Sequence, residues 1–383
     1  ETHFRLWEES QDDFHLEKTF EIIEKSKNLV SHELFQKSGR AEDLSKIELI
    51  VPKISAIQND FLSKDRALIN WFFSEGYFYI FSITQNDFFC IREELDFDLR
   101  EWISKMRSGI YHFPISGLKE AKKYNSDYLK YGLGLYEKLL KKSLEKLPSN
   151  VSKLTLLPDG LLNYLPFDAL LTEMPKDSFS FKSFPYLLKE YQISYAFSSA
   201  HLMDLLNSKN EKASKKYLGI APTFENDSRR LSPLAYNLTE VRFVQDIFNG
   251  DAFFADQATV ENFLNEASNY QILHFATHGN ASAEMGEISF LAFTDVADNE
   301  KDDLLYVKDF YDLDLNADLA VLSACETGIG EYRRGEGVVS LASGMAYSGV
   351  RSVVTTLWAV SDIASAKLVE SFFENIHLEM PKD

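Results

Sequence analysis

The sequence predicts an α/β protein with two halves and a mostly parallel sheet in the second half. From residue 217 to the end, short apolar runs alternate with helical patterns, which is typical of a parallel sheet covered on both faces. An earlier group of strand-like runs lies at residues 77–83, 88–91 and 153–157. With 383 residues and 45% hydrophobic content, the chain can bury one or two sizeable cores.

The N-terminal residues 1–62 are predicted to be helical. One apolar stripe at helical spacing runs through residues 16–37, formed by Leu16, Phe20, Ile23, Val30 and Leu34. This segment looks like the last helix of a tetratricopeptide (TPR) array, and the stripe needs a packing partner. Because the first residue is Glu1, we expect the chain to be a fragment of a longer repeat protein.

Residues 63–210 are expected to form an α/β half without catalytic residues. The runs 77–83 and 88–91 predict a hairpin, and Cys90 within it is assigned to the core. Residues 96–147 follow a helical period, set by Tyr124, Tyr128, Tyr131, Leu135 and Leu139. A short buried strand at 153–157 then stops at the turn formers of residues 158–160.

Residues 211–383 are predicted to form the catalytic half. Its strands are expected near 217–221, 272–276, 319–322 and 351–357. A helix is expected to begin after Gly337, with Val338 and Leu341 on its apolar face and Glu336 favoured near its start by the helix dipole, without a catalytic role. Its small residues Ser340, Gly344 and Ser348 are expected to approach the sheet closely.

Two of these strands each end in a reactive side chain. His278 follows the run 272–276, and Cys325 follows the run 319–322. Open α/β sheets bind ligands at the carboxyl ends of their strands. A cysteine nucleophile needs an imidazole to take its proton and return it to the leaving amine. Gly279 is expected to allow a sharp turn, so that its N–H and that of Cys325 form an oxyanion hole.

The spacing also favours a cysteine peptidase. His278 lies 47 residues before Cys325, close to the separation of roughly 50 residues in caspases. Either residue alone would be read as structural, Cys325 as a small buried hydrophobe and His278 as a loop histidine. Together, each followed closely by glycine, they favour the catalytic interpretation.

At these residues the chain resembles the CHAT domain, a family of the caspase and separase clan. The similarity rests on residues 273–279 (LHFATHG), 321–328 (VLSACETG), 335–337 (GEG) and 356–362 (TLWAVSD), and it extends to 156–167 and 190–196. It implies a caspase-like three-layer α/β/α sandwich and peptide hydrolysis by a dyad of His278 and Cys325. In the family a further segment follows, so we expect the chain to be truncated at its C-terminus as well.

The resemblance also bears on substrate and regulation. In the clan, residues after the strand at 351–357 wall the substrate cleft, which makes Trp358 and Asp362 candidate substrate-binding residues. Asp362 would pair with a basic P1 side chain, although a surface turn or a helix N-cap explains it equally well, and Trp358 is also compatible with packed core. CHAT domains usually follow TPR repeats in bacterial proteins and take part in regulated proteolysis, including defence, so we expect a protein activator acting through the TPR-like region.

Composition limits the remaining choices. A net charge of −19 argues against nucleic acid and anionic membranes as partners, so protein or peptide substrates are expected. Two cysteines far apart, no signal-peptide pattern and no apolar stretch of about 18 residues predict a cytoplasmic protein. No cofactor or metal is expected, because His274 and His278 lack the intervening Glu of a zincin helix.

Two alternatives from other functional classes remain open. The first is an interaction scaffold with a silent dyad. The second is a nucleotide-binding module, since the glycine-rich residues 328–335 follow a strand, although they match neither G-x-G-x-x-G nor a P-loop. An α/β-hydrolase is excluded because the sequence has no G-x-S-x-G elbow.

Overall fold

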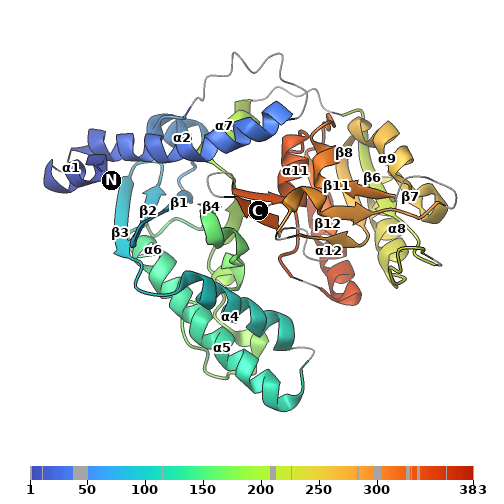
Figure 1. The fold of residues 1–383 in the computed structure, drawn as a ribbon, viewed down its shortest axis with the longest axis horizontal. Coiled ribbons are helices and arrows are strands. Elements are labelled where there is room, and N and C mark those ends of the chain that lie inside the picture. The colour runs from blue at the N-terminus through green and yellow to red at the C-terminus, as the bar shows by residue number, and fades with distance from the viewer. Residues whose placement is uncertain are drawn as a thin grey trace.

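The computed structural model of the chain has two five-stranded β-sheets side by side, each carrying its own helices (Figure 1). It describes residues 2–10, 12–37, 51–113, 116–207, 213–225, 227–282, 284–296, 303–324, 328, 330–333, 337–358 and 360–382. Side chains are described for most of these, but not for residues 28–37, 118, 332–338 and 362. Within the described ranges, no helix combines the length and the apolar character needed to cross a bilayer.

The N-terminal helices pack on the first sheet. Helix α1 spans Thr2–Ser10 and α2 spans Asp13–Lys37, followed by the short turns α3 (Ile54–Ala56) and η2 (Ile57–Phe61). The predicted stripe is confirmed where its side chains are described, because Leu16, Phe20 and Ile23 are all buried. Their partners include Leu68 and Phe81 of the sheet, so the stripe is satisfied within the chain. The TPR assignment remains a prediction.

The first sheet has the strand order β3-β2-β1-β4-β5. Its strands are β1 (Arg66–Ser74), β2 (Tyr77–Ile83), β3 (Phe88–Glu94), β4 (Lys153–Leu157) and β5 (Gln192–Tyr195). The predicted hairpin is confirmed as β2 and β3, which pair antiparallel, and the predicted strand at 153–157 is β4. The central strand β1 was not predicted. It pairs antiparallel with β2 and parallel with β4, which makes it the core of this half.

Helices cover this sheet and extend below it in Figure 1. They are α4 (Leu99–His112), α5 (Leu118–Tyr136), η4 (Glu137–Lys141) and α6 (Lys142–Leu144). The helical pattern predicted for 96–147 is thus confirmed, with a break between α4 and α5. Short 3-10 turns, η5 (Gly160–Tyr164), η6 (Phe167–Ala169), η7 (Phe181–Ser183) and η8 (Leu187–Lys189), connect β4 to β5.

The second sheet is entirely parallel, with the order β15-β12-β8-β6-β7. Its strands are β6 (Lys215–Ala221), β7 (Asp251–Phe254), β8 (Tyr270–Ala276), β12 (Leu319–Ser323) and β15 (Val353–Val354). The helices of this half are α8 (Asn237–Phe248), α9 (Val260–Glu266), α10 (Val307–Phe310), α11 (Leu341–Tyr347) and α12 (Asp362–His377). Small elements complete it: η9 (Ala255–Gln257), η10 (Ala267–Asn269), β9 (Gly279–Asn280), η11 (Gly286–Ile288), β10 (Phe290–Ala292), β11 (Leu304–Tyr306), β13 (Gly330–Arg333) and β14 (Gly337–Ser340).

Alternate residues of these strands face opposite helix layers, as the two-residue period of a strand requires. Ile272, Val321 and Leu319 pack with α8 and α12, whereas Leu273 and Leu322 pack with the layer that contains α9, α10 and α11. The predicted three-layer α/β/α arrangement with a mostly parallel sheet is therefore present, and it is compatible with a caspase-like fold.

The predicted start of one helix in this half was wrong. The helix expected from Val338 begins at Leu341, because residues 337–340 instead form β14, which pairs with β13. Ser340 is the N-cap of α11, while Glu336 lies outside the described residues. A Cβ atom on Gly344 would lie 3.2 Å from Val307 Cγ1, so at Gly344 the close approach is to α10.

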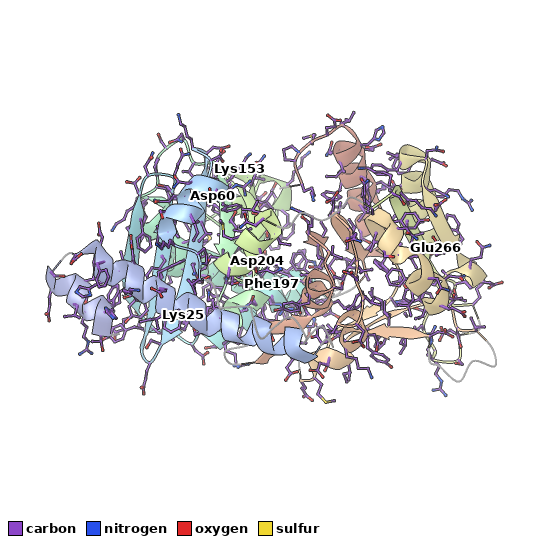
Figure 2. The ribbon with its side chains drawn as sticks, turned by 90° about the horizontal axis from the view of Figure 1, so that it is seen from above. Lys25, Asp60, Lys153, Phe197, Asp204 and Glu266 are labelled. Atoms are coloured by element: carbon purple, nitrogen blue, oxygen red, sulfur yellow. The ribbon has the colours of Figure 1, made fainter. Side chains whose placement is uncertain are left out.

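Helix α7 (Ser199–Asn207) joins the two halves. Phe197, just before it, stacks on Tyr347 of α11 with ring centroids 6.4 Å apart, and Arg351 donates to the backbone oxygen of Leu205 at 2.6 Å. Figure 2 shows the labelled Phe197 and Asp204 near the centre of the molecule, and α2, with its labelled Lys25, extending from the outer edge of the first half towards the second.

Candidate active site

The register of two neighbouring strands aligns the strand ends that precede the predicted dyad positions. Strands β8 and β12 are adjacent and parallel, as predicted, and Ala276 is the partner of Ser323. His278 is the second residue after β8, and position 325 is the second residue after β12. Cys325 itself lies outside the described residues.

The residues on either side of positions 325–327 are both held by Thr356. Its hydroxyl donates to the backbone oxygen of Ala324 at 2.6 Å, and its own carbonyl accepts from Gly328 N–H at 2.8 Å. A Cβ atom on Gly328 would lie 2.7 Å from Thr355 Oγ1, so only glycine permits this close approach. The backbone after β15 thus fixes both ends of the segment that contains Cys325.

His278 is oriented by the loop of residues 222–236, which follows β6. Its Nε2 lies 2.7 Å from the backbone oxygen of Ser232, and the edge of Phe224 packs on its ring with centroids 4.7 Å apart. A carbonyl oxygen only accepts hydrogen bonds, so this contact places a proton on Nε2. In the neutral ring, Nδ1 then carries the lone pair that can accept a proton. Neither Phe224 nor Ser232 was predicted. Ser232 contributes a backbone acceptor, which every residue type has, so the sequence gives no signal of it.

An ion pair holds that loop in place. Arg229 contacts Asp227 with an Nη2 to Oδ2 distance of 2.5 Å and donates to the backbone oxygens of Phe293 at 2.7 Å and Asp303 at 3.0 Å. Burial alone would raise the pKa of the Asp227 carboxyl, but its hydrogen bonds to Arg229 and the charge of that guanidinium outweigh burial and lower this pKa. The anchor therefore persists down to acidic pH.

Gly279 lies in the two-residue strand β9 and pairs with Leu291 of β10. Since Ala292 N–H donates to His278 O at 2.9 Å, this pair is not hydrogen-bonded, and Gly279 N–H points away from β10. Gly279 is not among the residues with positive φ, so the predicted sharp turn was wrong and the backbone here is extended. Its assignment to an oxyanion hole remains a prediction.

A buried hydrogen-bond chain lies directly beneath these strand ends. Glu240 of α8 accepts from His274 Nε2 at 2.8 Å and from the hydroxyl of Ser323 at 3.1 Å. His274 Nδ1 lies 2.8 Å from the hydroxyl of Tyr217. A proton on Nε2 lets Tyr217 donate to Nδ1, so every group in the chain has one consistent role. Burial, followed by the charge of Glu240, raises the pKa of Tyr217 well above its usual value.

One residue type in the sequence indicates this hydrogen-bond chain. His274 interrupts the apolar run of β8, and a fully buried imidazole requires polar partners. His274 contacts Glu240, whereas His278 contacts Ser232. In the described part of the chain, no three His, Cys, Asp or Glu side chains are grouped so as to hold a metal ion.

A small pocket lies between the ends of β8 and β12. Glu240, Ser323 and His278 line it, so the buried hydrogen-bond chain reaches the surface of the candidate site. The remaining lining residues are Leu234, Tyr236, Asn237, Ala276, Thr277, Ala324, Val360 and Ser365.

The other predicted site residues lie beyond β15, which is shorter than the predicted strand at 351–357. Trp358 is half-buried and lines a second pocket, together with residues of α4, so it is not simply core. Asp362 is the first residue of α12, and its side chain lies outside the described part. Cys90 is buried in β3 as predicted, and burial raises the pKa of its thiol well above its usual value.

Comparison with known families decides the relationship. The family model of the CHAT domain matches residues 129–383, two thirds of the chain. The chain belongs to the CHAT domain family. This is a caspase-like, protease-related family, in agreement with the three-layer second half. A search of curated proteins finds no significant match.

Proposed function

We propose that this CHAT protein is a cysteine endopeptidase, with Cys325 as the nucleophile and His278 as the general base and acid. The observation that carries the proposal is the register of β8 and β12, which pairs Ala276 with Ser323. Neighbouring strands lie about 4.8 Å apart, so side chains two residues beyond a paired position emerge at the same edge of the sheet. The bond from His278 Nε2 to Ser232 O, which leaves Nδ1 to accept a proton, supports the same roles.

The proposed reaction follows from these positions. His278 Nδ1 takes the thiol proton, and the thiolate attacks the scissile carbonyl of a peptide. Backbone N–H groups of Gly279 and Cys325 stabilise the oxyanion. His278 then protonates the leaving amine, and water hydrolyses the acyl-enzyme with the same imidazole as base. A carbonyl partner at Nε2 stabilises the imidazolium that forms between these steps.

The two cysteines of the chain provide an internal control. A thiolate is the reactive species, and the raised pKa of Cys90 keeps that buried thiol protonated at neutral pH. We therefore expect a peptidyl electrophile at pH 7.5 to label Cys325 alone, as read by mass spectrometry of peptides. Cys90→Ser should label like the wild type, whereas His278→Gln should lower labelling and turnover by about 10²- to 10⁴-fold.

Two outcomes would contradict the proposal. Labelling that persists in Cys325→Ala, or that moves to Cys90, would remove the nucleophile assignment. A wild-type protein that shows neither labelling nor turnover would favour the interaction scaffold, for which Cys325→Ala should leave binding unchanged.

Regulation by a protein partner through the TPR-like helices is part of the proposal. Its support is a buried polar bridge in which Glu24 of α2 accepts from Asn70 of β1 at 2.7 Å and from the N–H of Ser199 at 2.8 Å. Ser199 begins α7, the helix that joins the second half. If this bridge transmits regulation, Asn70→Leu should change the turnover of peptide substrates. Equal turnover in the variant and the wild type would contradict this route.

A further inference from the structure

A pocket of 490 Å³ lies beside the candidate active site, between α4 and the loop after β15. One face of α4 forms much of its lining, at the helical spacing of residues 100, 103, 104, 107, 108, 111 and 112. The opposite wall is Trp358, and Leu161 and Tyr164 of η5 complete the lining. The site is therefore built jointly by the two halves.

The charge of this pocket opposes that of the whole chain. Its ionisable lining residues are Arg100, Arg107, Tyr111, His112 and Tyr164, and none of its described lining residues is Asp or Glu, although the chain has a net charge of −19. The hydroxyls of Ser104 and Ser108 add hydrogen-bonding groups. Such a mixture of guanidinium groups, hydroxyls and aromatic rings suits a carboxylate carried on a partly apolar chain.

One of these cations is fixed in the pocket wall. Arg107 donates from Nη2 to the backbone oxygen of Leu357 at 2.8 Å, and its guanidinium lies 6.0 Å from the ring centroid of Tyr164. Arg100 is exposed near the start of α4. Arg100 lies two helical turns from Arg107 on the same face, so it is the cation of this face that the proposal assigns to a ligand.

The pocket is close enough to the proposed nucleophile to serve the same substrate. Thr356 holds Ala324, the residue before Cys325, and Trp358 follows Thr356 by only two residues. Two residues span at most about 7 Å, while an extended peptide advances about 3.3 Å per residue. A substrate lying across the candidate site would reach this pocket two or three residues from the scissile bond.

We propose that this pocket is a secondary substrate subsite that binds an acidic side chain of the polypeptide substrate, two or three residues from the bond that is cut. The inference rests on the proposed peptidase function for its position but not for its chemistry. It concerns a site separate from the P1 residue, so it leaves the prediction for Asp362 unchanged.

Binding can be measured without catalysis. Fluorescein-labelled peptides that differ only by Glu or Gln at one position are titrated by anisotropy into the Cys325→Ala protein, in low salt. We expect the Glu peptide to bind about fivefold more tightly than the Gln peptide, the effect of one partly exposed charge pair. Arg100→Gln should abolish this preference. Lys105→Gln should keep it, because Lys105 lies on the same helix but outside the lining, near Asp127.

A second pair of variants separates charge from folding. Ser104→Asp places a carboxylate in the pocket and should abolish the preference for Glu, whereas the similarly sized Ser104→Asn should retain it. Equal binding of both peptides, or equal effects of the Arg100 and Lys105 variants, would overturn the proposal. So would ATP binding that requires Arg100 while neither peptide binds.

The two proposals fail in different ways. If the Glu preference is observed but the wild type cleaves no peptide, the subsite stands and the peptidase assignment fails. If the wild type cleaves both peptides with equal kcat/KM, the peptidase assignment stands and the acidic subsite fails.

Discussion

Replacement of Glu240 tests the buried chain beneath the candidate site. Glu240 is 3% exposed and accepts hydrogen bonds from His274 and Ser323. In Glu240→Leu, both donors lose their acceptor while the volume is largely kept. The expected result is a loss of stability that comes from unsatisfied donors and not from a cavity.

The magnitude follows from the burial of each donor. The ring of His274 has no exposed surface, and a buried donor without a partner costs about 1–3 kcal/mol. The hydroxyl of Ser323 lines the small pocket, where water can replace the carboxylate, so it adds less. We therefore expect Glu240→Leu to lower the free energy of unfolding by about 2–4 kcal/mol.

Glu240→Gln distinguishes the acceptor from its charge. A glutamine oxygen still accepts from His274 Nε2, and its amide can donate to Ser323, so the expected loss is below about 1 kcal/mol. Asp246→Leu, at an exposed position of the same helix, is the control and should change stability by less than about 0.5 kcal/mol. Urea unfolding followed by far-UV circular dichroism measures all three. A glutamine variant as unstable as the leucine variant would refute the neutral donor chain, since the charge would then matter.

Three further predictions concern contacts within and between the halves. Tyr164→Phe removes the hydroxyl that donates to Gly330 O at 2.6 Å. The free energy of unfolding should fall by about 0.5–1.5 kcal/mol, and kcat/KM should fall as well. An unchanged free energy of unfolding and an unchanged kcat/KM would contradict the contact. Burial lowers the pKa of His201 to about 4 in the folded protein. Its contribution to the free energy of unfolding should therefore be constant above pH 6.5 and fall by about 3 kcal/mol towards pH 4. Thermal melts of His201→Phe should lack this pH dependence. Asn70→Leu removes the acceptor that lies 2.6 Å from Lys27 Nζ, so the free energy of unfolding in urea should fall by about 2–4 kcal/mol. A fall of less than about 1 kcal/mol would contradict this prediction.

The fold was largely predictable because its signals are local. Apolar runs such as 272–276 and 319–322 lie in strands β8 and β12, and their parallel pairing follows from the helices between them. The errors occur where pairing depends on distant residues. Val338 has the apolar character of a helix face, yet residues 337–340 form a strand because they pair with β13. No period within that short segment could have shown this.

The candidate site was predictable only in part. A histidine and a cysteine after buried strands are visible in the sequence, and the register of those strands aligns Ala276 with Ser323, the last residue of each strand. Ser232 could not be found, because it contributes its backbone oxygen from a loop. Glu240 has the sequence appearance of an exposed helix residue, and its burial results from the packing of α8 on the sheet beneath His274.

The first half takes part in building the candidate site, even though no catalytic residue is predicted in it. Thr356 holds Ala324 and Gly328, the residues that flank positions 325–327. The next residue, Leu357, is itself held by Arg107 of α4 in the first half. A displacement of α4 would therefore reach Ala324, the residue before position 325, through two hydrogen bonds and the adjacent residues Thr356 and Leu357. This short connection links a helix of the first half, which also lines the larger pocket, to the residues that flank positions 325–327.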